Sequence, residues 1–69
     1  MDAIWMRLST SEGNEYFMFG PGGVINFKPM TDNPEKSVLL FAHGGIAVVE
    51  ESNEELFELI RKFRKSNEI

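Results

Sequence analysis

Hydrophobic and polar positions alternate in the first part of the chain. Over residues 3–8, every second residue is aliphatic or a methionine: Ile4, Met6 and Leu8. A period of two is typical of a β-strand with one buried face, so we expect a strand here. Trp5 and Arg7 fall on the opposite face of that strand.

Further strands are predicted by short apolar segments separated by turn residues. Residues 16–19 (Tyr-Phe-Met-Phe) favour a strand because aromatic residues are enriched in sheets. The polar segment 9–15 before it predicts a turn. Residues 24–28 predict a third strand, which Pro29 ends because proline donates no hydrogen bond to a ladder.

The middle of the chain predicts two more strands. Residues 38–42 form a continuous apolar run, which suggests burial on both faces. His43-Gly44-Gly45 follows, and its glycines can supply the positive φ that tight hairpins require. Residues 46–50 then predict the fifth strand.

A helix is predicted from about Asn53 to Lys65. Ser52 and Glu55 have the spacing of a capping box, in which each side chain accepts a hydrogen bond from a backbone N–H at the helix start. The apolar residues that follow recur at helical spacing and share one face: Leu56, Leu59, Ile60 and Phe63.

These elements predict an α+β fold. All the loops are short enough to join antiparallel neighbours, so we expect a small antiparallel β-meander of four to five strands. The C-terminal helix is then packed on one face of the sheet.

One helix covers only one face, and both faces of the predicted sheet carry large apolar side chains. Contiguous exposed apolar surface usually marks an interface. The residues expected there are Trp5, Arg7, Tyr16 and Met18, and a homodimer or strand addition at an edge would cover them. The alternative is that sheet curvature or the 30–37 loop covers them. Phe57, at the border of the helix stripe, either seals the core or anchors a partner.

The composition narrows the function classes. The chain has 69 residues, which predicts a single small domain over residues 1–69. Without cysteine it has neither disulfides nor thiolate metal sites, and the lone histidine argues against an imidazole site. Small domains without such supports are marginally stable, so we expect a homodimer or higher oligomer.

The net charge of −4 argues against nucleic acid as a partner, because phosphate contacts need clustered Lys and Arg. Such a cluster occurs only at residues 61–65, where cations complement the dipole of the predicted helix end. No window approaches the roughly 20 apolar residues of a membrane span, and no signal peptide is visible. We therefore expect a cytoplasmic protein without a membrane partner.

Little in the sequence points to catalysis. His43 lies in a glycine turn with no nucleophile specified near it. The Gly20–Gly23 segment lacks the phosphate-loop pattern and precedes a strand. The glutamates of residues 50–58 lack calcium-loop spacing, and acidic residues are favoured in a first helical turn. We expect no enzymatic activity, no cofactor and no metal.

Residues 38–63 resemble the C-terminal half of the FlbD family of small flagellar proteins. The resemblance rests mainly on six residues: Gly44, Val49, Glu51, Ser52, Glu54 and Glu55. Gly20–Gly23, Trp5 and Phe19 depart from that family's pattern. The resemblance implies a bacterial accessory protein that acts by contact.

Two function classes follow. The first is a regulatory module that binds another protein and itself, which includes an inhibitor of a host protein of the phage type. The second is an oligomeric protein that binds a small anionic, nucleotide-like ligand between subunits. Its pocket would be built from Trp5, Tyr16, the Gly20–Gly23 loop and Arg7, with Arg7 on the anion and the aromatic rings stacking on a base. Arg7 in a cleft beside Trp5 would favour the ligand, and a solvated Arg7 would favour the interaction module.

Overall fold

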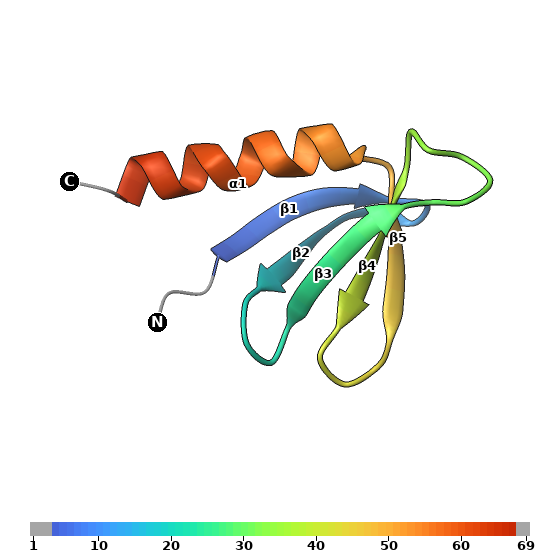
Figure 1. Cartoon of the computed structure of the whole chain (residues 1–69), viewed down its shortest axis with the longest axis horizontal. Helices are drawn as coiled ribbons and strands as arrows, with labels where there is room; N and C mark the ends of the chain where they lie inside the picture. Colours follow the sequence, from blue (N-terminus) through green and yellow to red (C-terminus); the bar gives the residue numbers. More distant parts are fainter. Residues whose placement is uncertain (1–3, 68–69) are drawn as a thin grey trace.

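The computed structural model describes residues 4–67, with side chains through Phe63. Five strands precede one helix (Figure 1). Their bounds are β1 Ile4–Thr10, β2 Gly13–Phe19, β3 Val24–Pro29, β4 Ser37–Phe41, β5 Ile46–Val49 and α1 Asn53–Asn67. The predicted α+β class, with a C-terminal helix on a small sheet, is confirmed. Ala3, which we expected to begin the first strand, lies outside the described residues.

The β1–β2 hairpin is longer than the sequence predicts. We expected a turn over residues 9–15, but only Ser11 and Glu12 lie between the strands. Gly13 has a φ of 114°, and no non-glycine residue in the described chain has a positive φ. Glycine adopts this positive φ without strain, so the chain reverses over two residues and the polar residues on either side continue the ladder.

The sheet is mixed, although most of it is antiparallel. The strands lie in the order β1-β2-β3-β4-β5, as a meander requires. β2 and β3 meet only at Phe19 and Val24, and that contact has a parallel pattern. The Gly20–Gly23 connection therefore separates the β1–β2 hairpin from the antiparallel unit β3-β4-β5.

The two edges of the sheet approach each other where β1 and β5 end. The Glu50 N–H donates to the Ser9 carbonyl at 2.8 Å. The Ser9 N–H in turn donates to both carboxylate oxygens of Glu51 at 3.0 Å. These contacts curl the sheet into a partly closed shape, and Figure 1 shows the strands converging at this end.

The core lies between the inner face of the sheet and α1. Its buried members come from every element: Met6, Leu8, Phe19, Val24, Leu39, Val49 and Leu56. Leu59 and Ile60 pack against this cluster from the helix. Three residues of the predicted helical stripe therefore cover the sheet, whereas the fourth, Phe63, is 38% exposed and lies outside the core cluster.

The central strand β4 is buried on one face only. Leu39 is fully buried, whereas Val38 and Leu40 are half-buried on the outer face. Their cross-strand neighbours on β5, Val48 and Ile46, are exposed. The continuous apolar run was therefore misleading, because no second layer covers this strand within the described chain.

The start of α1 has the predicted capping box. The Glu55 N–H donates to Ser52 Oγ at 3.2 Å, and the Ser52 N–H donates to Glu55 Oε1 at 3.4 Å. Buried Ser37 donates from Oγ to Asn53 Oδ1 at 2.8 Å, which ties the beginning of β4 to the helix start. These bonds fix where the helix leaves the sheet.

Replacing Ser52 by alanine should lower the free energy of unfolding by about 1 kcal/mol, because the Glu55 N–H loses its acceptor. Urea unfolding followed by circular dichroism measures this change. Ser11→Ala, in the exposed hairpin turn, is the matched control and should leave stability nearly unchanged. Equal effects of the two substitutions would contradict this role of Ser52.

Candidate functional site

The outer face of the β1–β2 hairpin gathers four of the residues singled out from the sequence. Trp5 lies directly opposite Met18, and Arg7 lies opposite Tyr16. Such cross-strand pairs are close enough for their side chains to interact. We call these four residues the hairpin patch. Trp5 and Tyr16 are 58% and 69% exposed, so the predicted alternation of β1 and β2 is confirmed.

Met18 is the least accessible member of the hairpin patch. It is half-buried because its side chain lies over Gly23 in the β2–β3 connection. A Cβ on Gly23 would lie 3.0 Å from both Met18 Sδ and Met18 Cε. The loop therefore covers part of Met18, while the two aromatic rings beside it stay exposed.

Arg7 also lines a groove between β1 and α1. Four carboxylates line the same groove, which has a volume of about 540 Å³: Glu51, Glu54, Glu55 and Glu58. Leu59 and Lys62 complete the lining. An anionic ligand at Arg7 would meet these carboxylates at close range, and like charges repel. The surroundings of Arg7 therefore argue against an anion site.

Phe57 does not belong to the hairpin patch. Its ring lies 5.1 Å from the ring of Phe27, centroid to centroid, with the planes tilted by 59°. Phe27 packs against the core from the inner face of the sheet, whereas Trp5 lies on the outer face. Phe57 is nevertheless 63% exposed, so it seals the rim of the core with one side and leaves the other side open.

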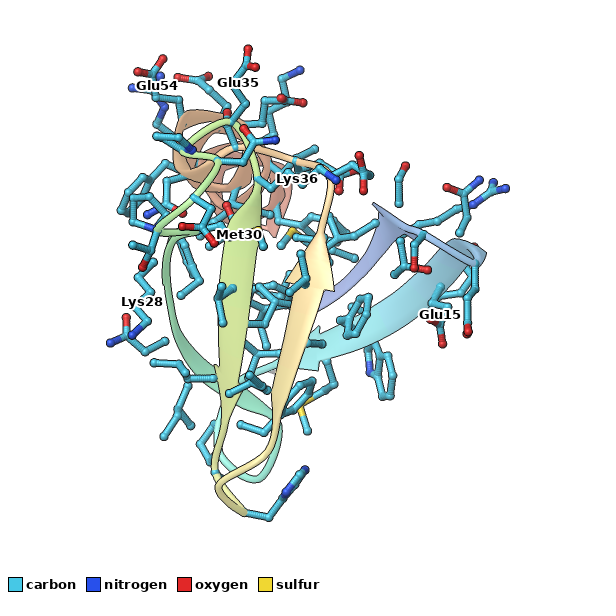
Figure 2. All side chains as sticks on the ribbon, turned by 90° about the vertical axis from the view of Figure 1, so that its right-hand side faces the viewer. Glu15, Lys28, Met30, Glu35, Lys36 and Glu54 are labelled. Carbon is cyan, nitrogen blue, oxygen red and sulfur yellow. The ribbon has the colours of Figure 1, made fainter. Side chains whose placement is uncertain are left out.

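A second apolar surface lies on the outer face of β4 and β5, where we had predicted none. It contains Val38 and Leu40 on β4 and Ile46 and Val48 on β5. A shallow hollow of about 320 Å³ borders it, lined in part by Lys28 and Met30, which Figure 2 shows beside β4. The sequence predicts burial on both faces for residues 38–42 and carries no such prediction for residues 46–50, so this surface is a finding of the structure.

The candidates for chemistry occupy structural positions. The His43 ring stacks on Phe41 at 5.3 Å, and its Nδ1 accepts the Gly45 N–H at 3.1 Å, so it forms part of the β4–β5 turn. Gly20–Gly23 leads into β3 rather than a helix. Among residues 4–67, no group of three or more acidic, histidine or cysteine side chains is arranged to hold a metal ion.

Comparisons with protein-family models, with curated proteins and with solved structures found no match. The resemblance to the FlbD family therefore stays a prediction. The helix within the described residues is too short and too polar to cross a membrane.

Proposed function

We propose that this chain is a non-enzymatic accessory protein that acts by contact with other proteins, in the cytoplasm, and self-associates through the hairpin patch. The observation that carries the proposal is the exposure of Trp5 and Tyr16 on one face of the β1–β2 hairpin. Leaving a large apolar side chain in water forfeits roughly 1.5–3 kcal/mol of burial. Burial against another protein surface would recover part of that free energy.

A second copy of this chain fits the hairpin patch by its charge. The chain carries a net charge of −4, so two copies repel each other over most approaches. The outer face of the hairpin presents no carboxylate from strand positions 5, 7, 9, 14, 16 and 18. Its one charged side chain is Arg7, and guanidinium groups bind favourably to the faces of aromatic rings.

In a dimer with two-fold symmetry, the hairpin patch of one subunit would be buried against the hairpin patch of the other. In an isologous dimer each surface meets the same surface of the partner, so Arg7 of one subunit can lie on the aromatic rings of the other. The pair would present a rigid, symmetric surface. An accessory protein of this kind regulates by occluding or bridging its targets, which includes inhibition of a host protein in the manner of phage-encoded inhibitors.

The ligand-binding alternative receives less support. It requires Arg7 to face an anion, and Arg7 instead borders a groove lined by four carboxylates. Trp5 and Tyr16 also line neither of the two hollows described above, whereas small-molecule sites are concave.

Trp5 is the only tryptophan, so its fluorescence reports directly on the hairpin patch. We expect its emission to shift to shorter wavelength with rising protein concentration as water leaves the ring. Tyr16→Ser should weaken this association at least about tenfold, because large exposed aromatic residues dominate interface energies. The measurement is an emission titration over a dilution series.

Ile46→Ser is the matched control, since Ile46 is 66% exposed but lies on the outer face of β5. It should leave the concentration dependence unchanged. An emission maximum independent of concentration would refute self-association through the hairpin patch. Loss of association in Ile46→Ser, with Tyr16→Ser unaffected, would assign the interface to the β4–β5 surface instead.

A further inference from the structure

The hydrogen bonds of Ser9 reveal which way the backbone of β1 points. Both its N–H and its C=O bond away from β2, toward Glu51 and Glu50. In an antiparallel pair, the backbone groups of successive residues point alternately to the two sides of the strand. Trp5 and Arg7 share the direction of Ser9, so their backbone groups face the free edge, whereas those of Met6 and Leu8 face β2.

At the free edge of β1, the backbone groups of Ser9 are therefore hydrogen-bonded. The backbone groups of Arg7 and Trp5, which face the same edge, are open. Among the described residues, no hydrogen bond reaches the edge-facing backbone groups of Trp5 and Arg7. Both residues are exposed. An open strand edge is a ready template for pairing with another chain, and natural proteins usually block it.

Arg7, one of the two open positions of this edge, also lines the groove between β1 and α1. Figure 1 shows α1, in orange and red, running along β1, in blue, and the two elements are in contact. The groove is a largely open depression of about 540 Å³. An extended segment placed there would bond to the β1 edge on one side and contact the helix on the other.

The charge of the groove determines which charge a partner should carry. Three of its four carboxylates, those of Glu51, Glu54 and Glu55, form no ion pair within the described residues, while Glu58 pairs with Arg61. Arg7 and Lys62 also line the groove, but the four carboxylates outnumber these two cations, so the surface beside the open edge is acidic. A second copy of this chain would bring further negative charge to it, so charge complementarity favours a basic partner over self-pairing.

We propose that the β1 edge binds an extended basic segment of another protein by strand addition in the groove between β1 and α1. Its backbone pairs with Trp5 and Arg7, and its Lys or Arg side chains lie against the glutamates of α1. Main-chain hydrogen bonds would contribute affinity and the charges would contribute specificity. The inference rests on the proposed contact function but does not depend on self-association.

Amide hydrogen exchange measured by NMR tests the open edge in the full chain. In the free protein, the amides of Trp5 and Arg7 should exchange quickly and those of Met6 and Leu8 slowly. A fluorescent peptide of alternating lysine and valine should then slow the exchange of Trp5 and Arg7. Protection of both amides before peptide is added would mean that another group already occupies the edge, which would overturn the proposal.

Peptide binding measured by fluorescence anisotropy tests the role of charge. Glu54→Lys should weaken binding of the lysine–valine peptide about fivefold or more, because a carboxylate facing the peptide becomes a cation. Glu15→Lys, with the same change in net charge, should have little effect. Figure 2 places Glu15 on the β1–β2 arm, well away from Glu54 at the helix start. Circular dichroism confirms that both variants are folded.

Equal weakening by the two variants, or equal binding of a glutamate–valine peptide, would refute the groove as the site. The outcome is separable from that of self-association. A protein that forms a dimer but does not bind the basic peptide would refute strand addition in the groove and leave self-association supported. A monomer that binds the peptide with protection at Trp5 and Arg7 supports it and refutes only self-association.

Discussion

Replacing Leu39 by alanine should remove most of the stability of this protein. Leu39 is fully buried on the central strand of the antiparallel unit, paired with Phe27 on one side and Ala47 on the other. Leucine-to-alanine changes in cores cost about 2–5 kcal/mol. A chain of 69 residues has a total stability of roughly 3–10 kcal/mol. We therefore expect a partly or wholly unfolded protein at 37 °C.

Leu40→Ala is the matched control for this prediction. Leu40 is the neighbouring residue of the same type, but its side chain lies half-buried on the outer face. We expect a loss of about 1 kcal/mol or less. Urea unfolding at one fixed protein concentration measures both variants, since association would otherwise add to stability. Similar losses would show that the inner and outer faces of β4 are wrongly assigned.

Replacing Gly23 by alanine should cost about 2–3 kcal/mol, although Gly23 does not have a positive φ. The new Cβ would lie 2.3 Å from the backbone oxygen of Met18, and a backbone atom cannot escape by changing rotamer. Shifting the loop would strain two further hydrogen bonds. The Gly23 N–H donates to the Gly20 carbonyl at 3.0 Å, and the Gly23 carbonyl accepts the Ala42 N–H at 2.9 Å.

Gly45→Ala provides the comparison within the same protein. A Cβ there would also come close to a neighbour, 2.4 Å from Cε1 of His43, but that atom belongs to an exposed side chain. The ring can rotate away and loses only its exposed hydrogen bond from the Gly45 N–H and its stacking on Phe41. We expect a loss of less than about 1 kcal/mol. Thermal unfolding of the two variants decides the matter. A Gly23→Ala variant as stable as Gly45→Ala would contradict the close approach of the β2–β3 connection to β2.

Local signals in the sequence predicted the helix and most of the strands. The capping box of Ser52 and Glu55 needs only neighbouring residues, and it is present. The glycines of His43-Gly44-Gly45 are predicted to supply positive φ to the β4–β5 turn; Gly44 does, with a φ of 96°, whereas Gly45 does not. The alternation of Met6 and Leu8 against Trp5 and Arg7 also predicted the two faces of β1 correctly.

The sequence prediction is wrong where polar residues belong to a strand rather than a loop. Ser9 and Asn14 continue the β1–β2 ladder, and their side chains contact each other across it, with Ser9 Oγ 3.0 Å from Asn14 Oδ1. That end of the hairpin is largely open to solvent, so its residues need not be apolar. In β4 the prediction is wrong in the opposite sense, because the apolar residues Val38 and Leu40 lie on an outer face that is only half-buried.

The site could be predicted only in part. The register of the β1–β2 hairpin pairs Trp5 with Met18 and Arg7 with Tyr16. These pairs can be predicted once the position of the turn is known. The groove beside β1 could not be predicted, since it depends on where α1 lies in space. Its glutamates are at least 44 positions from Arg7 in the chain, and their charges were explained locally by the helix dipole.

The most direct test of the account is the absolute mass of the protein in solution, measured by light scattering across a dilution series. The account predicts a mass that rises from one chain toward two as concentration increases, and a Tyr16→Ser variant that stays at one chain over the same range. A wild-type protein that remains a single chain at every concentration would contradict self-association through the hairpin patch.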